Sequence, residues 1–180
     1  MIINRSWAMP DHETFKIEPI KHLVWRYTFN KDTIIDPFAR NSKMANFTND
    51  MNPNTEAKYH FEAIEFLRML VEQKLRADVI LFDPPYSLRQ AKECYDSFYP
   101  GGFLKAHSQN AGGWFEEKRL CYKLLKVGGY FLHFGWHTNG IGKKNHADIK
   151  EILMVAHGRS HNDTLCTVEQ KLAEQHIFDF

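Results

Sequence analysis

Apolar residues recur at helical spacing in three segments of the chain. In the segment 15–27 (FKIEPIKHLVWRY) they lie three or four positions apart, which is typical of an amphipathic helix that begins near Pro19. The segment 61–75 (FEAIEFLRMLVEQKL) keeps its apolar positions close to a 3.6-residue period and predicts a second helix. A third helix is expected over 114–125, and the glycine pair at 128–129 is the signal that ends it.

Short apolar runs bounded by turn residues alternate with these helices and predict strands. The predicted strands are 32–38, 45–50, 77–82, 130–136, 149–156 and 165–170. The run 77–82 (ADVILF) is continuous, as expected for a central parallel strand that is covered on both faces. The last two runs lie close enough in sequence to form an antiparallel pair. This order indicates an α/β fold with a mostly parallel sheet and an antiparallel terminal strand pair.

The connection between the first two predicted strands is unusually short. Only six residues, 39–44, separate them. A crossover between parallel strands generally takes a dozen residues or more and usually contains a helix. We therefore expect the first helix of the sheet to be missing or reduced to a turn.

The composition is that of one folded domain. With 180 residues, of which 43% are hydrophobic and 25% charged, the chain can bury a core and has room for a single domain over 1–180. Its net charge of +1 provides almost no long-range attraction for a polyanion, so a nucleic acid would need a local basic patch. The segment 89–126 has seven Lys or Arg residues against four acids. This modest excess fits a solvated helix face as well as it fits a nucleic-acid contact.

The cysteines and histidines give no sign of a disulfide framework or a metal site. Cys94, Cys121 and Cys166 are widely spaced and form no CxxC pair, so we expect Cys121 and Cys166 to be core residues of a protein in a reducing cytoplasm. His157 and His161 are separated by a polar run that does not favour a helix, and no metal site is expected. No stretch approaches the ~18 apolar residues of a membrane span, and we expect a soluble, unprocessed protein.

Three acids follow predicted strands at their carboxyl ends. Asp36, Asp50 and Asp83 come after the runs that begin near residues 32, 45 and 77. Each one alone is compatible with an ordinary turn, because Asp commonly starts turns. In open parallel sheets, however, ligands bind beyond the carboxyl ends of the strands. The recurrence of acids at these ends therefore predicts a ligand site at that edge of the sheet.

The strongest signal is the tetrapeptide Asp83-Pro84-Pro85-Tyr86, directly after the most apolar strand. Two consecutive prolines fix φ and remove two N–H groups, which gives a stiff, extended turn. The Asp83 carboxylate and the Pro84 carbonyl both project from this turn as acceptors and could bind an amino group. Tyr86 adds a flat ring suited to stacking on an unpaired base.

In these residues the chain resembles the exocyclic-amino DNA methyltransferases, most closely the small adenine-specific enzymes carried by phages and mobile elements. The resemblance extends from about Asn4 to Lys171. It implies a single-domain, Rossmann-like methyltransferase sheet, S-adenosyl-L-methionine as the cofactor, and a cytoplasmic location in a bacterial or phage-infected cell. It also implies that Asp83, Pro84, Pro85 and Tyr86 form the catalytic motif.

The same resemblance assigns cofactor-binding residues. It places Phe15 and Lys16 at the methionine part of the cofactor, Asp50 at its ribose and Glu62 at its adenine amino group. The segment after the first strand matches through Asp36, Pro37 and Phe38.

Residues 39–43 (ARNSK) contain none of the glycines that the family usually has at this point. Arg40 could instead bind the cofactor carboxylate in a bidentate contact, with Asn41 and Ser42 as further donors. A cofactor site that has decayed beyond use is the alternative.

The implied reaction is methylation of the N6 amine of adenine in double-stranded DNA, with the target base flipped out of the helix. Segment 87–118 is the expected substrate-contacting insertion. Segment 137–144, which combines glycines with two lysines, is either a phosphate-contacting loop or an ordinary connection. Because no separate recognition domain fits in this length, a second subunit in a homodimer could contribute to specificity.

Two other functions stay open at this stage. One is methylation of a different planar amine, namely cytosine N4, an RNA base or a protein glutamine. The other is a non-catalytic module that binds nucleic acid or a protein partner and has lost the cofactor.

Overall fold

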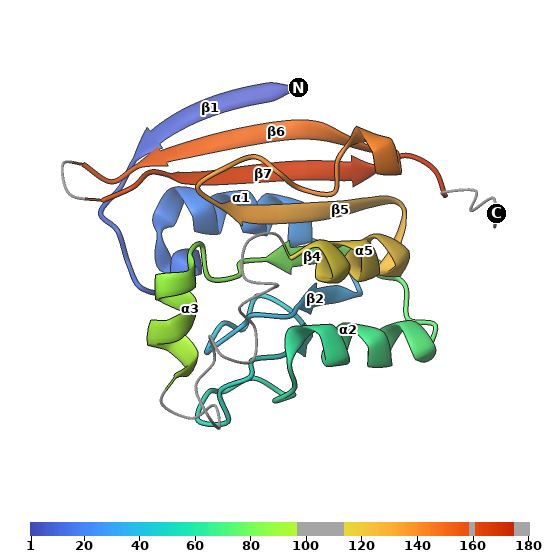
Figure 1. The fold of residues 1–180 in the computed structure, drawn as a ribbon. Coiled ribbons are helices and arrows are strands. Elements are labelled where there is room, and N and C mark those ends of the chain that lie inside the picture. Colours follow the sequence, from blue (N-terminus) through green and yellow to red (C-terminus); the bar gives the residue numbers. More distant parts are fainter. Residues whose placement is uncertain (97–113, 159–160, 175–180) are drawn as a thin grey trace.

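A seven-stranded sheet crosses the protein and carries helices on both faces (Figure 1). The computed structural model describes residues 1–96, 114–158 and 161–174. The strands are β1 (Ile2–Trp7), β2 (Ile34–Asp36), β3 (Phe47–Thr48), β4 (Ala77–Phe82), β5 (Leu125–Gly135), β6 (Ala147–Ala156) and β7 (Thr164–Lys171). Their order is β1-β6-β7-β5-β4-β2-β3. Only β7 is antiparallel to its neighbours, between β5 and β6, which confirms the predicted α/β class.

The helices of the described residues cover both faces of this sheet. They are α1 (Glu18–Thr28), α2 (Ala63–Glu72), α3 (Leu88–Tyr95) and α5 (Phe115–Leu124), with short 3-10 turns at Thr14–Lys16 and Lys143–Asn145. One hydrophobic cluster joins α1 to one face of the sheet, and a second joins α2 and α5 to the other face. The protein is therefore a three-layer α/β structure with two cores (Figure 1).

Helix α1 forms where the apolar spacing predicts it. Pro19 stands in the first turn, where its missing N–H removes no intrahelical hydrogen bond. Ile20, Leu23 and Val24 are at most 1% exposed and lie in the same cluster as Leu81 of β4. Burial of this stripe is what holds α1 on the sheet.

The helices on the opposite face bury the stripe that the period of segment 61–75 predicts. Phe66, Leu67 and Leu70 of α2 are fully buried and pack in one cluster with Cys121 of α5. Cys166 is buried on the α1 side of the sheet. Both cysteines are thus core residues, as expected, and the described cysteines form no disulfide.

The glycine pair at 128–129 does not end α5, so this sequence interpretation was wrong. The helix ends at Leu124, and the pair lies inside β5. Gly128 has a φ of +83°, and a Cβ on Gly129 would lie 2.9 Å from the carbonyl oxygen of Lys126 and 3.1 Å from that of Ala77. The glycines are needed because β5 is irregular where it first pairs with β4.

The connection from β2 to β3 contains no helix, as the short spacing predicts. Two backbone hydrogen bonds with Asn49, directly after β3, hold this connection in place. The Asn49 N–H donates to the Asp36 carbonyl at 2.9 Å, and the Ala39 N–H donates to the Asn49 carbonyl at 2.8 Å. The loop is therefore held close to the carboxyl end of β2.

Strand β1 is missing from the sequence interpretation because almost all of its side chains are exposed and its pattern carries no periodicity. It pairs in parallel with β6 at the edge of the sheet. Its Asn4 side chain donates to the buried carboxylate of Glu151, which also accepts hydrogen bonds from Arg26 and Tyr27 of α1. Although burial raises the pKa of Glu151, these bonds outweigh that effect and lower it. This polar network connects β1, β6 and α1.

Strand β3 lies next to β2 on one side, and the following strand, β4, lies next to β2 on its other side. The strand order therefore changes direction at β2, and ligands bind at such a switch point, beyond the carboxyl ends of the strands. The ends in question are Asp36 of β2 and Asp83, directly after β4.

No helix among the described residues is long and apolar enough to cross a membrane.

Candidate active site

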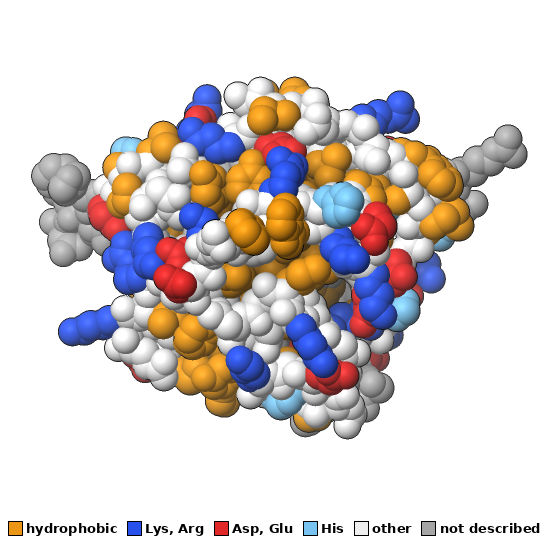
Figure 2. All heavy atoms as spheres, turned by 180° about the vertical axis from the view of Figure 1, so that it is seen from behind, with side chains coloured by type: hydrophobic (Ala, Val, Ile, Leu, Met, Phe, Trp, Pro, Cys, Tyr) orange, Lys and Arg blue, Asp and Glu red, His pale blue; other side chains and the backbone are white. Residues whose placement is uncertain are grey.

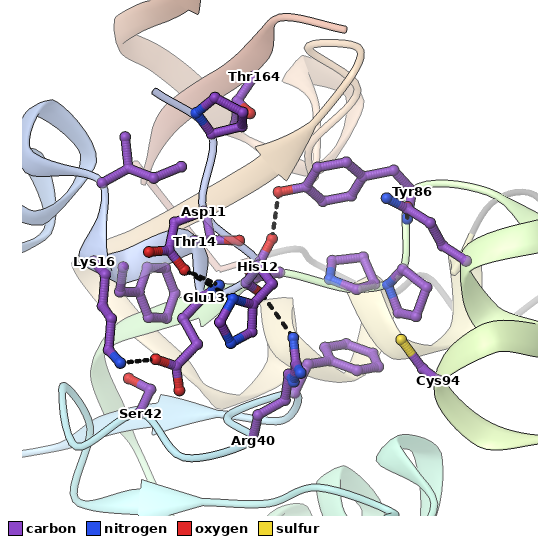
Figure 3. Close-up of a pocket in the computed structure, with 18 of the residues that line it drawn as sticks. Asp11, His12, Glu13, Thr14, Lys16, Arg40, Ser42, Tyr86, Cys94 and Thr164 are labelled. Carbon is purple, nitrogen blue, oxygen red and sulfur yellow. Dashed lines mark hydrogen bonds and ion pairs between the residues drawn. The ribbon is translucent and has the colours of Figure 1, made fainter. Parts of the chain in front are cut away.

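A cavity of about 1280 Å³ opens along the carboxyl edge of the sheet. Its walls come from segment 10–17 after β1, loop 38–44 after β2, and segment 83–86 after β4. Residues of α3 and the ends of β5, β6 and β7 complete the lining. The close-up shows the side chains of these segments pointing toward one another across the opening (Figure 3). A cavity therefore lies at the switch point of the sheet, beyond the carboxyl ends of β2 and β4.

Asp83 lies partly buried in the wall of this cavity. The Tyr86 hydroxyl donates to its Oδ1 at 2.6 Å, and the backbone N–H of Tyr86 donates to Oε1 of Gln90 at 2.7 Å. Burial raises the pKa of Asp83, although hydrogen bonds from Tyr86 and Thr14 and the charge of Arg40 act in the opposite direction. The proline corner therefore presents a carboxyl group whose ionisation is sensitive to its neighbours.

The Tyr86 side chain contacts two neighbours in the cavity wall. It packs edge-on against Trp136, with ring centroids 5.9 Å apart, and its hydroxyl is bound to Asp83. Burial raises the pKa of Tyr86 well above its ordinary value, so the phenol is a donor in this contact. The stacking role of Tyr86 stays a prediction, and Trp136 is a second aromatic side chain at the same wall.

Nine of the thirteen predicted site residues line the cavity. They are Phe15, Lys16, Phe38, Arg40, Asn41, Asp83, Pro84, Pro85 and Tyr86. Four lie outside its lining, namely Asp36, Pro37, Asp50 and Glu62. Glu62 precedes the first turn of α2. Its predicted contact with the adenine part of a cofactor stays a prediction.

Asp50 is turned into the protein and is 1% exposed. Its carboxylate accepts the backbone N–H groups of Arg40 at 3.1 Å and Asn52 at 2.9 Å. Burial raises the pKa of Asp50 above its ordinary value, and the two hydrogen bonds only partly oppose this rise. In this structure the side chain holds the glycine-free loop, while its predicted ribose contact stays untested.

Asp36 lies beneath the loop and not in the wall of the cavity. It is fully buried, and its Oδ1 accepts the Phe38 N–H at 3.0 Å. Its Oδ2 has no hydrogen-bond partner among the described residues, and a buried oxygen without a partner is costly. Because Asp36 does not line the cavity, its predicted role in cofactor binding stays a prediction.

Asp36→Asn is expected to raise the melting temperature near neutral pH. Burial, and next the charges of Asp83 and Asp50, raise the pKa of Asp36 well above its ordinary value. A raised pKa in the folded state stabilises the fold only below the unfolded pKa of about 3.9, and this contribution is lost as the pH rises through the folded value. The gain of the variant should therefore shrink as the pH approaches about 4.

Differential scanning fluorimetry across this pH range checks the result. Asp32→Asn, an exposed aspartate at the start of the same segment, is the matched control and should change little. A variant that melts lower than the unmodified chain at neutral pH would show that Asp36 stabilises the fold as an ionised group.

Sequence reasoning missed α3, which lines the cavity. Ser87 precedes its first turn, and the Ser87 hydroxyl accepts the Gln90 N–H at 3.2 Å while the Gln90 side chain accepts the Tyr86 N–H. This reciprocal arrangement closely resembles a capping box, and the Ser-x-x-Gln spacing is visible in the sequence. The remainder of the predicted substrate-contacting segment, residues 97–113, lies outside the described residues.

Segment 137–144 has less anion-binding capacity than its glycines suggest. The backbone N–H groups of Ile141 and Gly142 already donate to the buried carboxylate of Glu169. A Cβ on Gly140 would lie 2.0 Å from a Glu169 oxygen, which explains that glycine. The glycines of this loop therefore bind an internal carboxylate, which favours the ordinary connection.

The histidines and acids near the cavity do not indicate a metal centre. His157 is buried between the Ala8 carbonyl and the Thr164 hydroxyl, both 2.9 Å from its ring nitrogens. Asp11, His12 and Glu13 lie close enough to share an ion, but exposed acidic groups commonly gather without one.

Comparison with known proteins gives structural matches alone. No family model matches the sequence, and no curated protein is similar to it at a significant level. SMU.776, described as a methyltransferase and crystallised with SAH, matches with a TM-score of 0.54 at 13% identity over 82% of this chain and 47% of its own. TrmN from Thermus thermophilus matches with a TM-score of 0.55 at 13% identity over 87% and 49% of the two chains.

A protein from Streptococcus mutans, described as a SAM-dependent methyltransferase, gives a TM-score of 0.54 at 13% identity over 82% and 46% of the chains. The present chain thus spans about half the length of the solved structures that it matches. At this identity the likeness establishes a shared fold, and it confirms the predicted Rossmann-like sheet.

Proposed function

We propose that the chain transfers a methyl group from S-adenosyl-L-methionine to an exocyclic amine, and that the substrate is the N6 amine of adenine in DNA. One observation carries the proposal: the Asp83-Pro84-Pro85-Tyr86 corner opens into the cavity at the switch point of the sheet. The SAH bound to SMU.776 supports the choice of cofactor, because SAH is the demethylated form of this methyl donor.

The acceptors of the proline corner suit an aromatic amine. The lone pair of such an amine is delocalised into its ring, so the nitrogen is a weak nucleophile. The Asp83 carboxylate and the Pro84 carbonyl would accept its two N–H groups and favour the geometry in which the lone pair points at the methyl group. Positioning of this kind can supply on the order of 7–11 kcal/mol of barrier reduction.

The proposed donor site lies beside that corner. Phe15 and Lys16 on one side and Arg40 and Asn41 on the other would hold the methionine part. S-adenosyl-L-methionine would supply a sulfonium-bound methyl group for in-line transfer to the amine nitrogen. The N–C bond would form as the C–S bond breaks, SAH would be the leaving group, and the methylated amine would lose a proton to water.

The substrate must reach the corner as an unpaired base. Flipping a base out of a duplex costs a few kcal/mol, and stacking on Tyr86 or Trp136 at ~1–3 kcal/mol would recover part of that cost. Hydrophobic, basic and acidic side chains are interspersed on the rear face of the molecule (Figure 2). This face therefore presents no continuous basic surface for DNA.

Transfer of a deuterated methyl group tests the proposal. The protein is incubated with S-adenosyl-L-methionine carrying a CD3 group and with genomic DNA, and the DNA is digested to nucleosides for mass spectrometry. We expect labelled N6-methyladenine that depends on the protein. Parallel reactions with total RNA and with total protein detect the alternative substrates.

Each outcome of this experiment is decisive. Labelled N4-methylcytosine or a labelled RNA base would keep the methyltransferase but overturn the adenine assignment. No label in DNA, RNA or total protein would contradict the enzymatic function and favour a module that binds without catalysis.

A further inference from the structure

Trp136 gives the cavity a second aromatic side chain, directly after the carboxyl end of β5. It is 41% exposed, although tryptophan is highly buried on average. Tyr86 is only partly exposed, and its hydroxyl is bound to Asp83. Much of the Trp136 indole is therefore open to a ligand in the cavity.

The planes of the two rings decide how many bases they can hold. The Tyr86 and Trp136 rings meet at an interplanar angle of 73°, with centroids 5.9 Å apart. A base stacks with its plane parallel to that of the aromatic ring. One flat base therefore cannot stack on both rings. When the target base lies on Tyr86, beside Asp83, the Trp136 ring is left for a second base.

The arrangement of the rings identifies that second base. Because the rings are in contact, the base on Trp136 belongs to a nucleotide next to the target. In a duplex, successive bases are parallel and lie about 3.4 Å apart along each strand. Two rings at a steep angle instead hold successive bases that no longer stack on each other. Such bases belong to a strand that is unpaired around the target.

The size of the cavity agrees with a substrate larger than one base. Ligand pockets usually measure roughly 300–1,000 Å³, and this cavity has a volume of about 1280 Å³. It extends from loop 38–44, on the proposed donor side, to His161, Asn162 and Thr164 between and at the ends of β6 and β7. The part of the cavity beyond the donor therefore has room for a nucleotide next to the target.

A further exposed tryptophan lies at the rim of this cavity. Trp7 ends β1, is 64% exposed and pairs with Ala156, and the next residue, His157, lines the cavity. Every base has a π-face, so accessible aromatic rings bind single strands with little dependence on sequence. Trp136 and Trp7 therefore place accessible aromatic surface in the cavity and at its rim.

The charges of the cavity favour an unpaired strand over a duplex. Binding of a duplex depends mainly on cations that contact its phosphates. The described lysines of the lining are each paired with a nearby acid; they are Lys16, Lys21 and Lys43. The net charge of +1 adds almost no attraction. Stacking is therefore the stronger source of affinity at this site.

We infer that the chain methylates adenine in an unpaired stretch of DNA, and that Trp136 stacks on the base next to the target. The inference rests on the proposed function and narrows its substrate from DNA in general to single-stranded DNA. It assigns Tyr86 to the target base and Trp136 to the neighbouring base.

Short oligodeoxynucleotides with one adenine between thymines test the inference. We expect kcat/KM for methylation of the single strand to exceed that for the matching duplex by about 10-fold or more, because a base in the duplex must first be unpaired. Two further single strands carry an abasic site on one or the other side of the adenine. One of the two should lose about 10-fold in kcat/KM, because it lacks the base that stacks on Trp136.

Variants of Trp136 complete a double-mutant cycle with these strands. Trp136→Leu should lose about 10-fold on the intact strand and nothing further on the sensitive abasic strand, because both changes remove the same contact. Trp136→Phe keeps a ring and should stay within a few fold of the unmodified chain. Trp25→Leu is the matched control, because Trp25 is a 57% exposed tryptophan of α1 outside the cavity lining. It should leave all rates unchanged.

Two results would overturn the inference. Methylation of the duplex as fast as that of the single strand would show that the strand is not bound unpaired. Losses that multiply between Trp136→Leu and each abasic strand would show that Trp136 only supports Tyr86 in the wall.

Absence of methylation on every strand would instead contradict the proposed function. Fluorescence anisotropy with end-labelled oligonucleotides then decides the inference by itself. The single strand should bind more tightly than the duplex, and Trp136→Leu should weaken its binding by about 10-fold. Equal affinities for both forms, or a variant that binds the single strand unchanged, would overturn the inference.

Discussion

Asp83→Ala is expected to reduce methyl transfer by about 10²–10³-fold or more while the affinity for SAH changes by no more than a few fold. The carboxylate is proposed to accept an N–H of the substrate amine at the nitrogen that reacts, so its loss acts on the transition state. It lies in the cavity wall directly after β4 and is bound to the Tyr86 hydroxyl. Single-turnover rates and SAH calorimetry on the same preparation separate the two effects.

Asp78→Ala provides the matched control for this variant. Asp78 is on the same strand, near its opposite end, and forms an ion pair with Lys126 at 2.6 Å. Its loss should affect stability slightly and methyl transfer not at all. Asp83→Ala with unchanged activity would remove this residue from the mechanism, and equal losses in both variants would point to a general effect on β4.

Two substitutions of Tyr86 are expected to give different results. Tyr86→Ala removes the ring and should cost roughly 10–100-fold in methyl transfer if the ring stacks on the target base. Tyr86→Phe keeps the ring and removes the hydroxyl that donates to Asp83. Its rate near neutral pH should stay within several fold of that of the unmodified chain.

The pH profile of Tyr86→Phe carries the sharper test. The hydrogen bond from Tyr86 lowers the pKa of Asp83 against the rise that burial causes. Without that bond the pKa of Asp83 is higher, and the carboxyl group stays protonated to a higher pH. The acidic limb of kcat/KM should therefore move to higher pH in the variant. An acidic limb that does not move would show that Asp83 is not the group whose ionisation controls the rate.

The sequence predicts most of the sheet because its central strands are continuous apolar runs. The run 77–82 is β4 residue for residue, and the stripe of Ile20, Leu23 and Val24 identifies α1. Edge elements are harder to predict, because β1 buries no side-chain stripe and is held by pairing with β6 and by the distant contact of Asn4 with Glu151. Such contacts leave no local pattern.

The candidate site was predictable in its motif but not in its internal contacts. The Asp83-Pro84-Pro85-Tyr86 turn carries its stiffness in two prolines, and it lies at the cavity as expected. The sequence could not show that the Tyr86 hydroxyl binds Asp83, or that Asp50 turns inward to hold the loop around Arg40. The contact of Asp50 belongs to the helix-free connection between β2 and β3. The contact of Tyr86 with Asp83 is accompanied by the packing of the Tyr86 ring against Trp136.

Arg40 has a φ of +48°, a backbone conformation that its sequence position alone does not reveal. A missing glycine can indicate a decayed site, because bulky residues at positive φ are costly. In the structure, Arg40 places a cation in the cavity. Among the described residues, no acid forms an ion pair with it. That arrangement favours a site with a substituted contact over a site that has been lost.

In the proposed function, one cavity holds the methyl donor beside Asp83. A crystal structure of the chain grown with millimolar SAH would locate this ligand. We expect SAH between segment 10–17, loop 38–44 and the proline corner, with its carboxylate at Arg40 and its sulfur facing Asp83. SAH bound elsewhere on the protein, or an empty cavity in crystals that hold the ligand, would contradict it.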